Sequence, residues 1–234
     1  MRRHSSALRS LGVTVLAAAA ISGCLHRGPK VLGPVMDAER VAEALADGTR
    51  LRDPVRIDFE WRLTEEGVRI SGRGVARLEP PYRARLDLFS GDGETLVRAA
   101  LVGRDLRLPP GAPEDLLPPP DLLWGVLGVF LPEASGTLLG GDHLEGGDLR
   151  LRYADSDREE LQFRARDARV VELRRLRGGR LAEDVVLTSD PESPFPAEAT
   201  YRNLSEFREL RLIRTSVEAS GGFPPEIWNP TGGA

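Results

Sequence analysis

The chain has 234 residues, with 32 basic and 36 acidic side chains and a formal net charge of −4. Residues 1–23 hold three arginines and no acidic residue, so the remainder carries 29 basic and 36 acidic side chains, a net charge of −7. This acidic balance argues against nucleic acid as a partner, because such a chain is not attracted to phosphate backbones. The roughly 210 residues after position 23 suffice for one domain with its own core.

The first 23 residues have the pattern of an export signal. Arg2, Arg3 and Arg9 precede an apolar run, residues 11–20, that is too short to span a bilayer. The run leads into Ile21-Ser22-Gly23-Cys24, which matches a lipobox with cleavage between Gly23 and Cys24.

Cys24 is the only cysteine of the chain, so no disulfide can form within one molecule. A lone thiol would be a liability in an oxidising compartment, whereas acylation removes it and supplies an anchor. We therefore predict a lipoprotein that carries a thioether-linked diacylglycerol and an N-acyl chain, such as palmitate, on Cys24. The alternative is an ordinary signal peptide with a chance cysteine.

Residues 24–34 are predicted to be a lipidated tether, because they contain glycine and proline and show no periodicity. Residues 37–46 are predicted to form a helix with Asp37 as its cap, ending at Asp47-Gly48. The domain is expected to span residues 35–220. Residues 221–234 form a tail whose apolar side chains we expect along an open edge of the sheet.

Residues 55–63 alternate strictly between apolar and charged side chains, the pattern of a strand with one dry face and one wet face. Four further strands are predicted, and short turns such as Glu65-Glu66-Gly67 join them. Their ranges are 68–78, 82–88, 94–102 and 105–108. Five consecutive strands with short turns predict an antiparallel meander.

Residues 122–130 are apolar on nearly every side, which predicts a buried helix after the cap Asp121. A glycine-rich segment, residues 136–147, leads to the second half. Alternation then predicts six more strands, at 149–153, 161–166, 171–173, 181–187, 197–203 and 207–217. The total is about eleven strands.

The predicted fold is therefore mainly β: a single curved antiparallel sheet, forming an incomplete β-barrel, with an N-terminal helix and a central lid helix that enclose a hydrophobic cavity. A sheet of this size must curl, and too few helices are predicted to fill its concave side. The expected lining is Ile57, Phe59, Trp61, Leu86 and Leu88 from the strands and Leu123, Trp124, Leu127 and Phe130 from the lid. An equal alternative is a sandwich or barrel whose own side chains fill its core.

The motifs of several enzyme classes are missing. The sequence has no HxxxH, no Cys/His cluster and no GxSxG. Neighbouring acids such as Glu159-Glu160 lie on a strand, where they point to opposite faces and cannot act as a pair. We therefore predict no enzyme activity, no catalytic residue, no metal and no cofactor beyond the covalent lipid on Cys24.

The order of elements resembles the LolA/LolB-type lipoprotein localisation family, most closely the LolB-type receptor. The local likeness spans residues 85–132 and consists of Arg85-Leu86-Asp87-Leu88-Phe89, Gly93-Glu94-Thr95-Leu96, Leu122-Leu123-Trp124-Gly125 and Phe130-Leu131-Pro132. The resemblance implies a cavity that takes the acyl chains of other lipoproteins, with a periplasmic carrier protein as donor. One departure is the turn Ser90-Gly91-Asp92-Gly93, which lacks the exposed leucine of the family's receptors.

The expected function is that of a monomeric, membrane-anchored lipoprotein that binds acyl chains and acts in lipoprotein localisation or insertion. Leu25, rather than an aspartate, follows Cys24, which favours the periplasmic face of the outer membrane by analogy with lipoprotein sorting. One alternative is a glycerolipid-binding or transport lipoprotein of the same fold. Another is a non-catalytic scaffold lipoprotein of an envelope complex.

Overall fold

The structure is a computed structural model that describes residues 28–230, apart from residues 113–115 and 157. The predicted signal, its cleavage position at Gly23 and the lipidation site Cys24 lie outside the described residues. Within the described part, no helix has the length and apolar character needed to cross a membrane.

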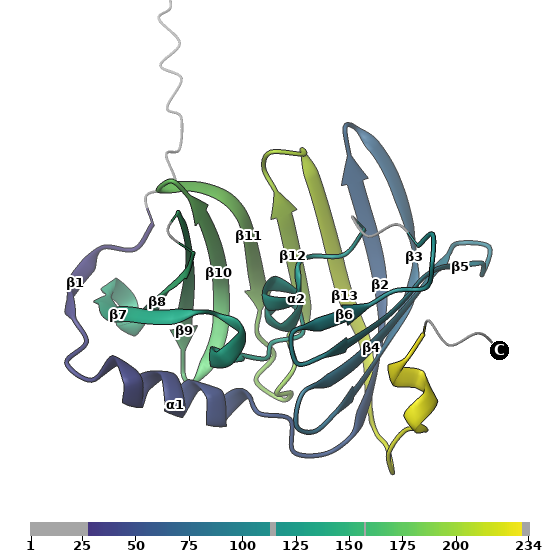
Figure 1. Cartoon of the computed structure of the whole chain (residues 1–234), viewed down its shortest axis with the longest axis horizontal. Helices are drawn as coiled ribbons and strands as arrows, with labels where there is room; N and C mark the ends of the chain where they lie inside the picture. The colour runs from purple at the N-terminus through teal and green to yellow at the C-terminus, as the bar shows by residue number, and fades with distance from the viewer. Residues whose placement is uncertain (1–27, 113–115, 157, 231–234) are drawn as a thin grey trace, which may run out of the picture.

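Thirteen strands form one antiparallel sheet in the order β1-β7-β8-β9-β10-β11-β12-β13-β2-β3-β4-β5-β6 (Figure 1). The sheet curves but does not close, since β1 and β6 remain its two edges. The strands of the first half are β1 (Val31–Pro34), β2 (Val55–Glu65), β3 (Val68–Glu79), β4 (Arg83–Ser90), β5 (Thr95–Val102) and β6 (Asp105–Arg107). Those of the second half are β7 (Thr137–Leu144), β8 (Leu149–Ser156), β9 (Glu159–Arg166), β10 (Arg169–Arg177), β11 (Arg180–Thr188), β12 (Glu198–Asn203) and β13 (Arg208–Ala219).

The predicted curved sheet and incomplete barrel are confirmed, but β1 and β7 were not predicted. β1 takes the last four residues of the expected tether and pairs with β7, with Val31 opposite Leu144. β7 lies in the glycine-rich segment, where a register shift between Leu138 and Gly140 breaks the alternation. A strand of four residues and a strand with two glycines give too weak a periodic signal to be recognised in the sequence.

Two α-helices accompany the sheet. α1 (Ala38–Thr49) begins at the predicted cap, where the Asp37 carboxylate accepts a hydrogen bond from the Arg40 amide at 3.0 Å. It ends later than predicted. α2 (Pro120–Val126), the predicted lid helix, is shorter than the expected 122–130, because Gly128 adopts a left-handed conformation directly after it. Short 3₁₀ helices are η2 (Pro132–Ala134), η3 (Glu145–Gly147) and η4 (Pro225–Trp228).

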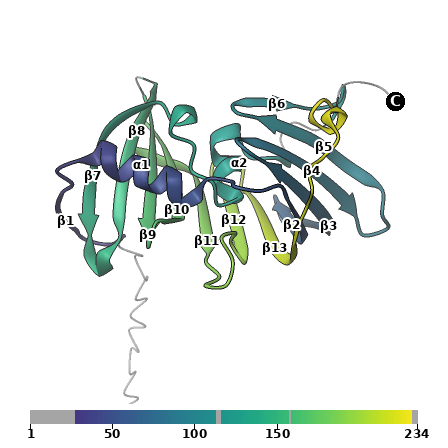
Figure 2. The same ribbon diagram turned by 90° about the horizontal axis from the view of Figure 1, so that it is seen from below.

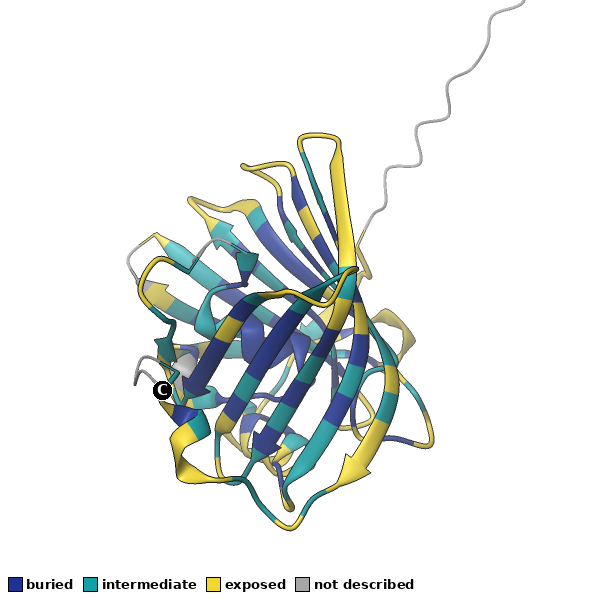
Figure 3. Cartoon of the chain, turned by 90° about the vertical axis from the view of Figure 1, so that its right-hand side faces the viewer, coloured by how far each residue is buried: buried dark blue, intermediate teal, exposed yellow. Residues whose placement is uncertain are grey.

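Both α-helices lie on the concave side of the sheet, α1 against β7 and β10 and α2 against β10, β11 and β12 (Figure 2). Buried and exposed residues alternate along the strands, as Figure 3 shows. In β2, for example, Ile57, Phe59, Trp61 and Leu63 are buried on the concave side. The alternation thus places the apolar core between the sheet and the two helices.

The tail packs on the outer face of the sheet rather than along an edge, contrary to prediction. η4 contacts β4 and β5 (Figure 1). Arg85 donates to the Ile227 carbonyl at 2.8 Å, and Arg107 donates to the Trp228 carbonyl at 3.0 Å. The arginines of the charged outer face supply the donors that hold the tail there, and Trp228 is buried.

Candidate functional site: the lid helix and the concave face

The structure brings together all nine side chains that the sequence predicted to line a cavity. Each is at most 6% exposed, and all belong to one core cluster of the described residues. The five strand residues are Ile57, Phe59, Trp61, Leu86 and Leu88, and the four from the lid segment are Leu123, Trp124, Leu127 and Phe130. The concave face and the lid are therefore one packed unit.

The interior holds little free space between these residues. The cleft between α2 and the sheet has a volume of about 30 Å³, and Ile57, Phe59 and Leu127 lie on its walls together with Phe195 and Leu212. This volume corresponds to roughly one water molecule in the liquid. The predicted cavity of ligand size is therefore not found among the described residues in this conformation, because the lid and neighbouring side chains fill the concave side.

Aromatic side chains that the sequence analysis did not assign to the site hold the lid segment. Trp124 meets Tyr82 edge-on at 6.0 Å between ring centroids. Phe130 meets Phe163 at 4.8 Å and Tyr153 at 6.0 Å, both in T-shaped geometry. Such contacts add specific geometry to apolar burial. Tyr153 and Phe163 lie on dry faces of strands that alternation had identified, so the sequence did carry a signal for them.

Two hydrogen bonds fix the lid segment to elements on either side of it. The Trp124 indole Nε1 donates to the Gly103 carbonyl in the β5–β6 turn at 2.7 Å. The Phe130 amide donates to Thr49 Oγ1, at the end of α1, at 3.0 Å. The lid is thereby tied to the first half of the sheet and to the N-terminal helix.

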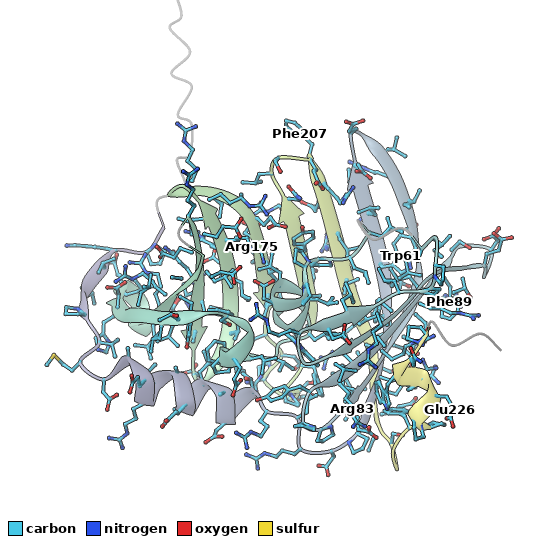
Figure 4. All side chains as sticks on the ribbon, viewed as in Figure 1. Trp61, Arg83, Phe89, Arg175, Phe207 and Glu226 are labelled. Atoms are coloured by element: carbon cyan, nitrogen blue, oxygen red, sulfur yellow. The ribbon has the colours of Figure 1, made fainter. Side chains whose placement is uncertain are left out.

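A buried ionic cluster, formed by Asp121, Arg175, Glu183 and Tyr201, ties the lid to the second half. Arg175 on β10 donates to both carboxylate oxygens of Asp121, in the first turn of α2, at 2.5 Å. It also donates to Glu183 Oε2 at 2.8 Å, and the Tyr201 hydroxyl donates to Glu183 Oε1 at 2.6 Å. Figure 4 labels Arg175 beside the lid. The Nε of Arg175 has no partner among the described residues.

The cluster keeps its charges through mutual compensation. Burial alone would lower the pKa of Arg175, but the charges and hydrogen bonds of Asp121 and Glu183 outweigh burial and raise it. Burial raises the pKa of Tyr201, and its hydrogen bond to Glu183 raises it further, so the hydroxyl stays protonated.

Sequence reasoning missed this cluster although a signal existed. Arg175 lies two residues after Leu173, and Glu183 lies two residues before Val185. Both neighbours are fully buried, so a period of two places Arg175 and Glu183 on the concave face. The two residues depart from the general pattern, in which charged side chains lie on the wet face of a strand.

Trp61, on the concave side of β2, forms its hydrogen bonds with the neighbouring strands. Its Nε1 donates to the carbonyls of Arg73 and Phe89 at 3.0 Å each, across β3 and β4. A hollow with a volume of about 680 Å³ lies next to Trp61. It lies on the right-hand side of Figure 4, where Trp61 and Phe89 are labelled, and its lining also includes Glu60, Arg62 and Arg73. The walls of this hollow carry both apolar and charged side chains, and of the nine predicted cavity residues they include Trp61 alone.

Among residues 28–230, with the gaps given above, no group of three or more His, Cys, Asp or Glu side chains could hold a metal ion. The arrangement around the lid consists of apolar walls, tethering hydrogen bonds and one closed ionic cluster. What such a site can do chemically is to shelter or release an apolar group.

No family model matches the chain, and no curated protein matches its sequence. Solved structures with a similar fold include a domain assigned as an outer membrane lipoprotein-sorting protein from Vibrio parahaemolyticus. That comparison has 11% identity, a TM-score of 0.47, and coverage of 82% of this chain and 97% of that one. A DUF1329 family protein from Desulfovibrio piger has 7% identity, a TM-score of 0.46 and the same coverage.

MucB of Pseudomonas aeruginosa, in complex with MucA, has 16% identity and a TM-score of 0.31. That comparison covers 81% of this chain and 59% of the other.

Proposed function

We propose that this chain is a membrane-anchored lipoprotein that takes up acyl chains between α2 and the concave face of the sheet, and that it acts in lipoprotein localisation at the outer membrane. The observation that carries the proposal is the construction of the lid. A seven-residue helix covers the apolar concave face, and five of its residues are buried there. Few polar contacts hold it in place.

Opening the lid breaks three polar contacts: the Asp121–Arg175 ion pair, the Trp124–Gly103 hydrogen bond and the Phe130–Thr49 hydrogen bond. It also separates Trp124 and Phe130 from their aromatic partners. An acyl chain would then occupy the space that Leu123, Trp124 and Leu127 fill in the closed conformation. The unpartnered Nε of Arg175 would offer a donor to a lipid ester carbonyl at the rim of that space.

The energies are compatible with exchange. An acyl chain of ~14 methylenes gains roughly 11 kcal/mol on leaving water, at ~0.8 kcal/mol per methylene. Much of this gain is offset, because the chain must displace lid side chains that are already buried. The net affinity is therefore moderate, which suits a protein that must give its cargo up to a membrane. The protein binds and releases the acyl group without forming a covalent bond to it.

The tight packing of the interior favours a second candidate, a scaffold lipoprotein with a permanently filled core. The two are separated by extracting the full-length protein in mild detergent and analysing its non-covalent lipids by mass spectrometry. Ala199 lies on the wall of the small cleft, whereas Thr200 lies on the opposite face of the same strand. We expect acyl lipid in the wild type and in Thr200→Leu, and its loss in Ala199→Leu. Folded protein without lipid in all three would support the scaffold.

A depletion experiment separates localisation from lipid transport. If the chain delivers lipoproteins, its depletion lowers the amount of other lipoproteins in the outer membrane. If lipid co-purifies but that amount is unchanged, the glycerolipid-transport alternative is correct.

A further inference from the structure

Exposed apolar side chains gather at one end of the sheet, at the tips of two adjacent hairpins. Phe207 is 79% exposed and Leu204 is 43% exposed, both in the turn between β12 and β13. Val68 and Ile70 start β3, directly after the β2–β3 turn, and are 67% and 42% exposed. The two hairpins are neighbours because β13 pairs with β2, with Arg208 opposite Glu65. Figure 4 labels Phe207 at this end of the molecule.

The backbone at Phe207 indicates that its exposure is not incidental. Phe207 has a φ of 51°, in the left-handed region that glycine or asparagine normally occupies at the end of such hairpin turns. A glycine there would relieve the backbone and leave the tip polar. The chain instead places a large aromatic side chain on the tip.

The described chain begins at the same end of the sheet. Gly28 lies against the Arg174 side chain on the outer face of β10. One row of paired residues runs across the sheet from this position to both tips, each residue lying opposite the next on the neighbouring strand. From β10 to β3 the row is Arg174, Asp184, Arg202, Glu209, Thr64 and Arg69. Glu209 is two residues from Phe207, and Thr64 is two residues from Glu66, which begins the other turn.

The short link to Cys24 limits where the lipid can be. Three residues lie between Cys24 and Gly28, and the four residue-to-residue steps of an extended chain span at most ~14 Å. Two residues of strand from the row to either tip span roughly 7 Å. A lipid on Cys24 therefore lies within reach of the membrane surface that the tips would touch.

We propose that the tips of the β2–β3 and β12–β13 hairpins, led by Phe207, are a membrane-contacting edge that inserts into the interface of the bilayer in which the Cys24 lipid is anchored. This inference rests on the anchoring part of the proposed function and does not depend on acyl cargo. Arg69 and Arg180, exposed at the same end, would meet lipid phosphates, whereas Glu66 and Glu206 in the turns limit the depth to the interface. The contact would orient the sheet upright on the membrane.

The test uses the fact that Cys24 is the only native cysteine, so an engineered cysteine in the acylated protein is the single free thiol. Full-length protein with Phe207→Cys is labelled with an environment-sensitive fluorophore and reconstituted in vesicles of phosphatidylethanolamine and phosphatidylglycerol. Met36→Cys is the matched control, since Met36 is 96% exposed and apolar but precedes α1 at the lower border of Figure 1. Leu204→Cys is a second tip variant should Phe207→Cys fold poorly.

We expect a shift of emission to shorter wavelength and quenching by brominated lipids at positions 204 and 207, and neither effect at position 36. Equal quenching at 36 and at the tips, or none at the tips, would overturn the inference, as would tip labels that are protected only by a second protein. Mass spectrometry of the same samples tells whether Cys24 carries lipid. Absence of lipid refutes the anchor itself, while lipid with unquenched tips refutes the membrane-contacting edge alone.

Discussion

Asp121 and Arg175 join the lid helix to the second half of the sheet through two hydrogen bonds of 2.5 Å, and their side chains are only 10% and 7% exposed. Glu183 accepts from the same guanidinium at 2.8 Å, so the arginine keeps one carboxylate when the other leaves. This arrangement allows the lid to detach without leaving a bare buried cation. The ion pair is therefore the contact at which opening and closing of the lid can be adjusted.

Replacement of Asp121 by alanine tests this role. We expect Asp121→Ala to lower the free energy of unfolding by roughly 1.5–3 kcal/mol, the range for hydrogen bonds to charged groups. The measurement is denaturant unfolding followed by tryptophan fluorescence. Asp105→Ala is the control, because Asp105 forms a comparable pair with Arg107 at 2.7 Å but is exposed. Its loss should cost about 0–1 kcal/mol. Equal effects of the two variants would mean that the buried pair contributes no more to stability than the exposed pair does.

Gly72 lies at a close approach between β3 and β4. A Cβ atom at residue 72 would come within 1.9 Å of the Phe89 carbonyl oxygen and 3.0 Å of the Trp61 ring. Gly72→Ala should therefore separate β3 from β4 and lower the melting temperature. Gly91→Ala, in the following turn, meets nothing closer than 4.0 Å and should leave the melting temperature nearly unchanged. A tolerated Gly72→Ala would disprove this close approach.

The free energy of unfolding should fall at alkaline pH, because the buried Tyr153 hydroxyl ionises less readily in the folded state than in the unfolded state. Burial, and next the charge of Glu133, raise the pKa of Tyr153 from 10.0 to about 12 in the folded chain. The folded state thus favours the neutral phenol. Its contribution to stability is complete below pH 10 and is lost as the pH rises from 10 to about 12.

Tyr153→Phe keeps the ring contacts with Phe130 and Phe163 and removes the ionisable group. We expect a shallower loss of unfolding free energy above pH 10 in this variant than in the wild type. Tyr82 and Tyr201, whose pKa values are also raised by burial, retain part of the decline. Parallel curves for wild type and variant would show that Tyr153 does not titrate with unfolding.

The anchor prediction is tested at Cys24. Because both cleavage and acylation require the thiol, Cys24→Ser should accumulate as an unprocessed precursor without incorporated palmitate. The measurement is metabolic labelling followed by mass determination. A variant that is still cut after Gly23 and still labelled would refute lipidation at this residue.

Alternation of apolar and charged side chains predicted eleven of the strands, because a half-buried strand leaves a period of two in the sequence. It could not reveal β1, which has four residues, or β7, in which two glycines and a register shift interrupt the alternation. Nor did it show how far the core is filled. Phe195 comes from a proline-rich loop and lies with Leu127 and Leu212 on the walls of the small cleft, an arrangement that exists only after folding.

Charged residues were the second source of error, since the strand pattern assigns them to solvent by default. Arg175 and Glu183 lie on the same strand faces as their buried neighbours Leu173 and Val185. A buried arginine is stable there only because acidic side chains from other elements pair with it. Asp121 supplies such a partner from 54 residues away. No local pattern in the sequence predicts the contact between Asp121 and Arg175.

The most direct test of the account is the binding of a fluorescent fatty acid to the full-length protein. The central claim is that α2 opens to admit an acyl chain. We predict saturable binding of the fatty acid at one site per protein chain, displacement by palmitate, and faster association in Asp121→Ala. Ala199→Leu should lose the site, and this loss distinguishes binding to the protein from uptake of the fatty acid by detergent. Absence of a saturable site in wild type and Asp121→Ala, with both still folded by tryptophan fluorescence, would contradict the claim and leave a lipoprotein with a closed core.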